Sequence, residues 1–138
     1  MGVLIDASVL ITHERTGLDL TERLRGREEQ PAYLSAITAS ELLHGVHRAT
    51  TPAIRNRRGA FVEAILRQLP LLPIDMNVAR AHARVWAELA SAGTPIGAHD
   101  MWLAATCVAH GLSIATANVR EFRRVHGLEV EDWSQPVA

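Results

Sequence analysis

The chain has 138 residues, of which 48% are hydrophobic and 21% charged, and its formal net charge is −1. This length fits one domain with one core, and the charge argues against binding nucleic acid through a broadly basic surface. All 14 basic side chains are arginine, which excludes lysine-dependent sites such as the P-loop or a Schiff base. The single cysteine, Cys107, excludes an internal disulfide and a cysteine-based zinc cage, and we expect it to be buried filler.

Neither a membrane span nor a signal peptide is predicted. No apolar run approaches the roughly 20 residues that cross a bilayer, and the first residues lack a basic region followed by a cleavage site. We therefore expect a cytoplasmic protein with no membrane contact.

Apolar runs separated by turn residues predict strands and helices in alternation. The predicted strands are residues 2–6, 32–35, 71–75, 112–115 and 128–131. The predicted helices are residues 7–14, 18–25, 39–49, 53–69, 78–92, 98–110 and 118–124. Such alternation is typical of the α/β class. We expect one domain over residues 1–138, with a central parallel sheet of four or five strands flanked by helices.

Three carboxylates, Asp6, Glu41 and Asp100, each stand where a strand-like run gives way to a helix. In a parallel α/β sheet these junctions lie along one edge, where ligands usually bind. We therefore expect the three side chains to converge although they are far apart in the sequence. Without a cation they would repel one another and at least one pKa would rise, whereas Mg²⁺ takes oxygen ligands of this kind.

Each acid also has a purely structural explanation. Asp6 could cap the helix that follows it, and residues 38–41 match a Thr-x-x-Glu capping box. Asp100 lies in a first helical turn, where negative charge is favoured, and residues 118–121 repeat the capping pattern. Capping explains each acid taken singly, but it does not explain why all three are expected at the same edge of the sheet.

Other polar residues near these junctions have weaker claims to a site. His99 adjoins Asp100 but has no second histidine at the spacing of a zinc pair, so a polar first-turn position explains it equally well. Ser8 could orient Asp6 or bond the helix backbone, with the backbone role slightly favoured. Asp75 is better explained as a cap for the following helix.

Arginines form two clusters that could contact nucleic acid locally. Their members are Arg48, Arg55, Arg57, Arg58 and Arg67 in one cluster, and Arg120, Arg123 and Arg124 in the other. A solvated helix face, with some charge near a helix C-terminus, is the simpler explanation for either cluster alone.

Four ordered segments carry the acids and their neighbours. They are Leu4–Ser8, Thr38–Leu42 with Gly45, Ile96–Asp100 with Leu103–Ala105, and Ala115–Asn118 with Phe122. In order and spacing they resemble the motifs of PIN-domain ribonucleases, most of all the short VapC toxins of bacterial type II toxin–antitoxin systems. The resemblance runs from residue 3 to about Trp133.

The resemblance implies a PIN fold with an acidic metal centre of Asp6, Glu41 and Asp100, and with Thr116 nearby. Mg²⁺ or Mn²⁺, held mainly by Asp6 and Asp100, would support hydrolysis of RNA phosphodiester bonds by a toxic endoribonuclease. Asn118 stands where family members often have a fourth acid, and it could give an oxygen ligand or orient a water. We therefore expect one firmly bound cation. The family also implies a VapB-like antitoxin and a homodimer.

Two other classes of function are compatible with parts of the pattern. A PIN-fold module that binds RNA or protein without turnover is supported by Asn118 in place of an acid. An aspartate-phosphorylated phosphatase or receiver domain fits less well, because the phosphatase needs a second Asp where Ser8 stands and both need a lysine.

Overall fold

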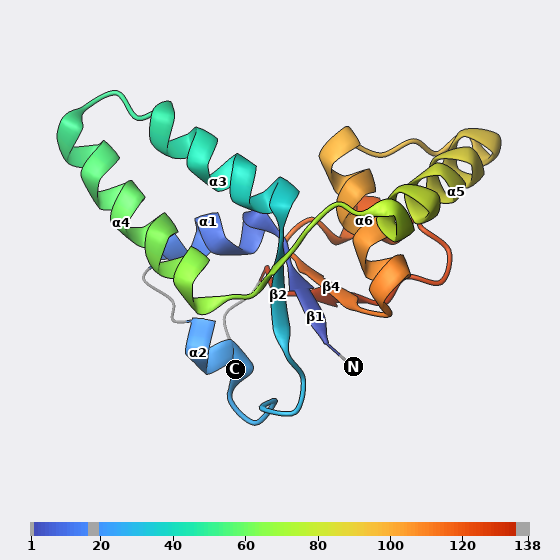
Figure 1. Ribbon diagram of the computed structural model, residues 1–138, viewed down its shortest axis with the longest axis horizontal. Helices are drawn as coiled ribbons and strands as arrows, with labels where there is room; N and C mark the ends of the chain where they lie inside the picture. The colour runs from blue at the N-terminus through green and yellow to red at the C-terminus, as the bar shows by residue number, and fades with distance from the viewer. Residues whose placement is uncertain (1, 17–19, 135–138) are drawn as a thin grey trace.

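The structure, a computed structural model, describes residues 2–16 and 20–134. Its strands are β1 (Val3–Ile5), β2 (Ala32–Ser35), β3 (Leu71–Leu72), β4 (Ser113–Thr116) and β5 (Val130–Asp132). Its helices are α1 (Ala7–Thr16), α2 (Leu20–Leu24), α3 (Ala36–His47), α4 (Pro52–Gln68), α5 (Met76–Ala92), α6 (Ala98–His110) and α7 (Val119–Phe122). The strands within these ranges form one parallel sheet in the order β3-β2-β1-β4-β5 (Figure 1). The predicted α/β fold with a parallel sheet is confirmed.

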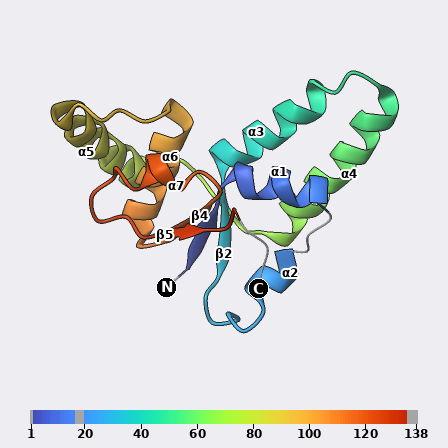
Figure 2. The same ribbon diagram turned by 180° about the vertical axis from the view of Figure 1, so that it is seen from behind.

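Helices cover both faces of the sheet, which explains why its central strand is apolar throughout. Side chains alternate between the faces of a strand. Val3 and Ile5 of β1 join a core cluster with residues of α1, α3 and α4, whereas Leu4 joins a cluster with residues of α5 and α6. Figures 1 and 2 show these two groups of helices on opposite sides of the strands. No helix within the described ranges is long and apolar enough to span a membrane.

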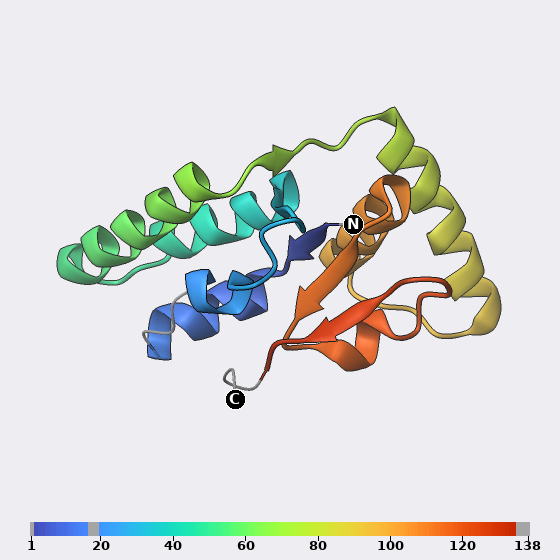
Figure 3. The same cartoon turned by 90° about the horizontal axis from the view of Figure 1, so that it is seen from below.

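The order of the strands reverses at β1. The chain adds β2 and then β3 on one side of β1, and later adds β4 and β5 on the other side. In open α/β sheets the crevice outside the carboxyl ends of the strands, at such a reversal, is the usual ligand site. Figure 3 shows β1 and β4 running side by side toward this edge, in agreement with the register that pairs Ile5 with Ala115. A site in this fold is therefore expected where β1 and β4 end.

The start of α3 differs from the prediction. The Ser35 hydroxyl accepts a hydrogen bond from the Ile37 amide at 3.0 Å, so Ser35 caps the helix and α3 begins at Ala36 rather than at residue 39. Thr38 and Glu41 consequently lie inside the helix, and their interpretation as a capping box was wrong. Serine ending a strand is an equally good cap, and it starts the helix earlier in the chain.

Other boundaries move by a few residues. β3 ends at Leu72, before Pro73, which has no amide N–H to donate to a neighbouring strand. Asp75 then caps α5 as predicted, accepting from the Val78 amide at 3.0 Å. The predicted helix over residues 18–25 is present as α2, with its first two residues outside the described ranges. The last helix and the last strand are shorter than predicted, at Val119–Phe122 and Val130–Asp132.

Two glycines in helical regions should respond to alanine in opposite directions. Gly93 ends α5 with φ of 69°, a left-handed conformation that costs about 1–2 kcal/mol for a residue with a Cβ, so Gly93→Ala should destabilise the fold by that amount. Gly59 lies inside α4, where a Cβ would meet Val46 at an ordinary 3.7 Å, so Gly59→Ala should stabilise by about 0.5–1 kcal/mol. Urea unfolding of the two variants beside wild type measures both changes. Shifts of the same sign would contradict this account of the helix end.

Candidate active site

Asp6 is the fixed point of the candidate site. It follows β1 directly, its side chain is buried, and its amide donates to the Ala115 carbonyl of β4 at 2.9 Å. Its Oδ2 atom accepts hydrogen bonds from the Ser8 hydroxyl at 2.7 Å and the Thr116 hydroxyl at 2.8 Å. A carboxylate that is bonded in this way can remain buried at the end of a strand.

The two hydroxyls are themselves held by backbone amides. Ser8 Oγ accepts from the Ala117 amide at 3.0 Å, and Thr116 Oγ1 accepts from the Asn118 amide at 2.9 Å. The favoured interpretation of Ser8, a bond to the helix backbone, was wrong, because its hydroxyl orients Asp6. Thr116 lies beside Asp6, where the family resemblance placed it. Together these contacts tie the start of α1 to the end of β4.

Glu41 reaches the site from α3 on one side of the sheet, and His99 meets it from α6 on the other. The Nδ1 atom of His99 lies 3.0 Å from Oε1 of Glu41. Burial raises the pKa of Glu41, His99 partly offsets that rise, and the negative charge of Asp6 adds to it. Glu41 is therefore close enough to Asp6 for the two charges to interact.

Asp100 lies half-buried in the first turn of α6. Its pKa is raised to about 7, first by burial, then by a hydrogen bond with Glu121, and further by the negative charges of Asp6, Glu121 and Glu41. The three acids singled out in the sequence thus lie at one edge of the sheet and repel one another there. At neutral pH and without a cation, a large share of Asp100 side chains retains a proton.

Glu121, on α7, is a fourth acid of this site, and its sequence position predicts only a role in a helix cap. The protonated Asp100 side chain donates to Glu121, and this bond, with a second from the Gly97 amide, lowers the pKa of Glu121. A Cβ on Gly97 would lie 3.7 Å from Oδ2 of Asp100 and 3.9 Å from Oε2 of Glu121, so the glycine lies against both acids. Glu121 also lies at a junction between a strand and a helix, since it is in the first turn of α7, which follows β4. The criterion that selected the other three acids could therefore have found it.

Asn118 does not behave as the capping pattern predicts. It precedes α7 and is exposed, but its side chain makes no capping hydrogen bond. The cap interpretation of residues 118–121 was therefore wrong. The role of Asn118 as a fourth ligand stays a prediction.

The donor chemistry of the site fits a hard divalent cation. The acids offer oxygen ligands, and a cation between them would relieve the repulsion that raises the pKa values of Glu41 and Asp100. Across residues 2–16 and 20–134, no three His, Cys, Asp or Glu side chains lie closely enough together to hold a metal ion between them. Mg²⁺ commonly uses one or two carboxylates and keeps several waters, so two acids with water suffice.

The raised pKa of Asp100 predicts how stability depends on pH. Between about pH 4, where an unfolded aspartate releases its proton, and about pH 7, the folded chain binds more protons than the unfolded chain. Stability of the metal-free protein should therefore fall across this window as pH rises. Asp100→Asn removes the effect, so the Tm of the variant relative to wild type should rise from about pH 4 to about pH 7 and level off above that.

Thermal unfolding at several pH values without divalent ions measures this difference. Glu63→Gln, at an exposed position of α4, serves as the matched control and should follow wild type at every pH. Adding Mg²⁺ at pH 8 should raise the Tm of wild type more than that of Asp100→Asn. Parallel curves for wild type and Asp100→Asn would show that the Asp100 pKa is not raised.

Known proteins place the chain in a family. Residues 3–128 match the PIN domain family. The chain is 36% identical over 130 residues to ribonuclease VapC1 of Rickettsia felis, covering 94% of this chain and 95% of that protein. It is 37% identical over 100 residues to the tRNA(fMet)-specific endonuclease VapC of Salmonella typhimurium, covering 72% and 74% of the two chains. The solved structure of DNA-bound VapBC from Salmonella typhimurium superposes with a TM-score of 0.86 at 30% identity, covering 96% and 98%. The chain therefore belongs to the VapC ribonucleases of the PIN-domain family.

Proposed function

We propose that this chain is a toxic endoribonuclease that depends on Mg²⁺ or Mn²⁺ and acts within a type II toxin–antitoxin pair. The observation that supports the metal dependence is the approach of Glu41 and Asp100 to Asp6 beyond the end of β1, where burial and the negative charge of Asp6 raise the pKa of both. Membership in the VapC ribonucleases supports RNA as the substrate.

The carboxylates would have different roles in binding the cation. Asp6, fixed by two hydroxyls, and Asp100 would be the main ligands, and Glu41 would complete the shell directly or through water. When bound, the cation polarises the scissile phosphate and lowers the pKa of an attacking water. Glu121 accepts a hydrogen bond from the protonated Asp100 side chain, so it would hold Asp100 in position until a cation displaces that proton.

Glu121 also bears on the rival function, a PIN-fold module that binds without turnover. The support for that rival was an Asn where relatives often have a fourth acid. Here a fourth carboxylate is supplied by Glu121, one turn further along the chain than Asn118, in hydrogen-bond contact with Asp100. The candidate site therefore contains one more carboxylate than the sequence alone indicates.

Three arginines of the two clusters donate to backbone carbonyl groups. Arg58 donates to the Gly45 carbonyl at 2.9 Å, and Arg55 donates to the Ala49 carbonyl at 3.1 Å. Both therefore satisfy carbonyl groups at the end of α3, the role expected for cations at a helix C-terminus. Arg124 likewise donates to the Pro95 carbonyl at 2.8 Å.

A VapB-like antitoxin is the proposed regulatory partner. The solved Salmonella typhimurium relative is a VapBC assembly bound to DNA, and it covers nearly the whole chain. An Arg or Lys side chain of such an antitoxin, placed among the acids, would occupy the charge site of the cation. The same family likeness leads us to propose a homodimer.

Removing the carboxylate of Asp6 tests the function directly. Asp6→Asn keeps the size of the side chain and one oxygen for the hydroxyls, but it removes the charge that holds the cation. Even groups that only support metal ligands are worth about 10- to 100-fold, so loss of a ligand should lower kcat by at least about a hundredfold. Cleavage of total cellular RNA with Mg²⁺ or Mn²⁺ and thermal unfolding of the same samples measure both properties. Retained cleavage by a folded Asp6→Asn variant would refute the assignment.

Glu121 and Asn118 make different predictions as the fourth polar group. Glu121→Gln should reduce cleavage about 10- to 100-fold, because it removes a charge that is hydrogen-bonded to Asp100. Asn118→Ala should stay within about threefold of wild type, since only the backbone amide of Asn118 bonds the site. Rates measured over a series of Mn²⁺ concentrations compare the two variants. The opposite ranking would make Asn118 the functional fourth residue.

A further inference from the structure

A side-chain contact joins α3 to α6 across the edge of the sheet where Asp6 lies. The Nδ1 atom of His99, in the first turn of α6, lies 3.0 Å from Oε1 of Glu41 on α3. The two helices pack on opposite sides of the strands, so the contact bridges two separately packed parts of the fold (Figure 1). The side chain of His99 is 64% exposed and that of Glu41 is 32% exposed. The contact therefore lies on the solvent-facing side of the acidic site.

Glu41 needs such a partner because its own side chain does not fix its position. A glutamate side chain has three rotatable bonds, and the negative charge of Asp6 lies close enough to repel this one. Asp6, by contrast, is buried and held by two hydroxyls. The hydrogen bond from His99 keeps the Glu41 carboxylate near the other acids against their repulsion.

We propose that His99 is a positioning residue for the cation site, an inference that rests on the proposed metal-dependent function. By donating to Oε1, His99 fixes the Glu41 carboxylate and leaves Oε2 for the cation or for one of its waters. Carboxylates that bind metal ions are usually hydrogen-bonded by a neighbouring group, and loss of that group typically costs about 10- to 100-fold in metal affinity or activity. Because His99 directly precedes Asp100, one turn of α6 supplies both a main ligand and the partner of Glu41.

A contribution to folding alone is the simpler role for an exposed ion pair, and it makes a different prediction. Exposed pairs contribute little to stability, and alanine is a better helix former than histidine. Removing the His99 imidazole should thus leave the Tm of the metal-free protein close to that of wild type. Its effect should appear when the cation binds, since Glu41 must then be in place.

Mn²⁺ binding without RNA tests this inference. The Kd for Mn²⁺ is measured by isothermal titration calorimetry for wild type, His99→Ala, His99→Phe and His99→Asn. Phenylalanine keeps a ring but has no donor, whereas asparagine places an amide N–H close to the position of Nδ1. The Kd should rise at least about tenfold in the alanine and phenylalanine variants and stay within about threefold of wild type in His99→Asn. Equal losses in all three variants would overturn the inference, because the donor would then not matter.

A double-mutant cycle determines whether His99 acts through Glu41. In a Glu41→Gln background the carboxylate that His99 orients is gone, so adding His99→Ala should leave the Kd for Mn²⁺ unchanged. Losses that multiply in the double variant would mean that His99 contacts the cation itself, and they would overturn the positioning role.

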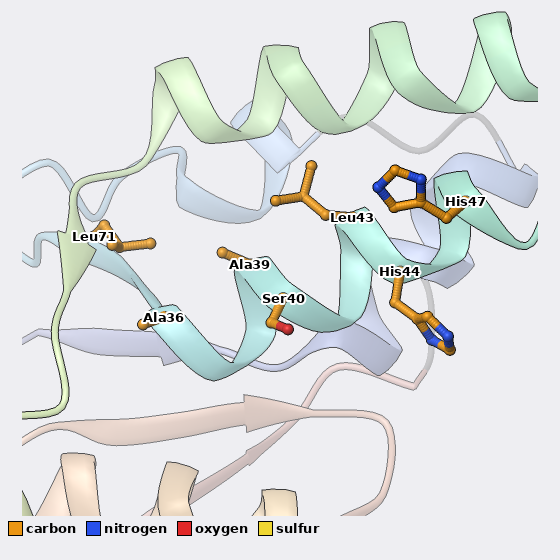
Figure 4. A pocket seen from close by; sticks show the side chains of 7 residues that line it. All are labelled: Ala36, Ala39, Ser40, Leu43, His44, His47 and Leu71. Carbon is orange, nitrogen blue, oxygen red and sulfur yellow. The ribbon is translucent and has the colours of Figure 1, made fainter.

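α3 offers a matched control. His44 and His47 are exposed and line a hollow along this helix (Figure 4), and neither Glu41 nor His99 belongs to that lining. His47→Ala removes an imidazole from the same helix as Glu41 and should leave the Kd for Mn²⁺ unchanged. A rise in Kd as large as that of His99→Ala would mean that the loss of any neighbouring imidazole weakens binding, which would overturn the specific role of His99.

The outcomes separate this inference from the function on which it rests. Wild type that binds Mn²⁺ without cutting RNA would refute the proposed ribonuclease, while the Kd values would still decide the role of His99. Cleavage by wild type with an unchanged Kd in His99→Ala would refute the role of His99 alone, and so would a lower metal-free Tm without a change in Kd. Wild type that binds no Mn²⁺ would refute both.

Discussion

The pair of hydroxyl hydrogen bonds to Asp6 is the interaction on which the rest of the site depends. A buried carboxylate must be paired or hydrogen-bonded, and here Ser8 and Thr116 supply these bonds from two different parts of the chain. Because the hydroxyls are in turn bonded by amides at the end of β4, the charge is held by the backbone of the sheet itself. Glu41 and Asp100 lie near the Asp6 carboxylate, whose position is fixed by these hydrogen bonds.

The carboxylates of the site repel one another in the folded chain, and protonation of Asp100 reduces this repulsion. Asp100 takes the proton because it is more buried than Glu121, which keeps its charge through bonds from Asp100 and Gly97. His99 interacts with Glu41 and partly offsets the rise in the pKa of Glu41 that burial and the charge of Asp6 cause. A divalent cation bound by the carboxylates would offset their repulsion more strongly than the proton and His99 do. The site therefore offers oxygen ligands for a cation, although no three of its side chains lie close enough to hold one between them.

The sequence predicted the parallel sheet and the convergence of the acids, because strand periodicity and strand–helix junctions are local signals with one dominant structural meaning. It was wrong where one residue type serves two purposes. Ser35, rather than Thr38, begins α3, and both are good caps by composition. Glu121 matches a cap equally well, and only the approach of the Gly97 turn to α7, a contact between distant segments, makes it a neighbour of Asp100. Ser8 was misassigned for the same reason, since its partner Ala117 is remote in sequence.

The register between β1 and β4 has a consequence for how such a site can vary. Ile5 pairs with Ala115, so Asp6 and Thr116 leave the sheet as neighbours at the spacing of adjacent strands, about 4.8 Å. That spacing is a property of backbone hydrogen bonding and is the same whatever side chains surround it. The sheet thus fixes the distance between Asp6 and Thr116, whereas the positions of Glu41 and Asp100 depend on how α3 and α6 pack. Differences in substrate choice within such a fold are therefore free to accumulate on the helices while the fixed carboxylate stays where the strands put it.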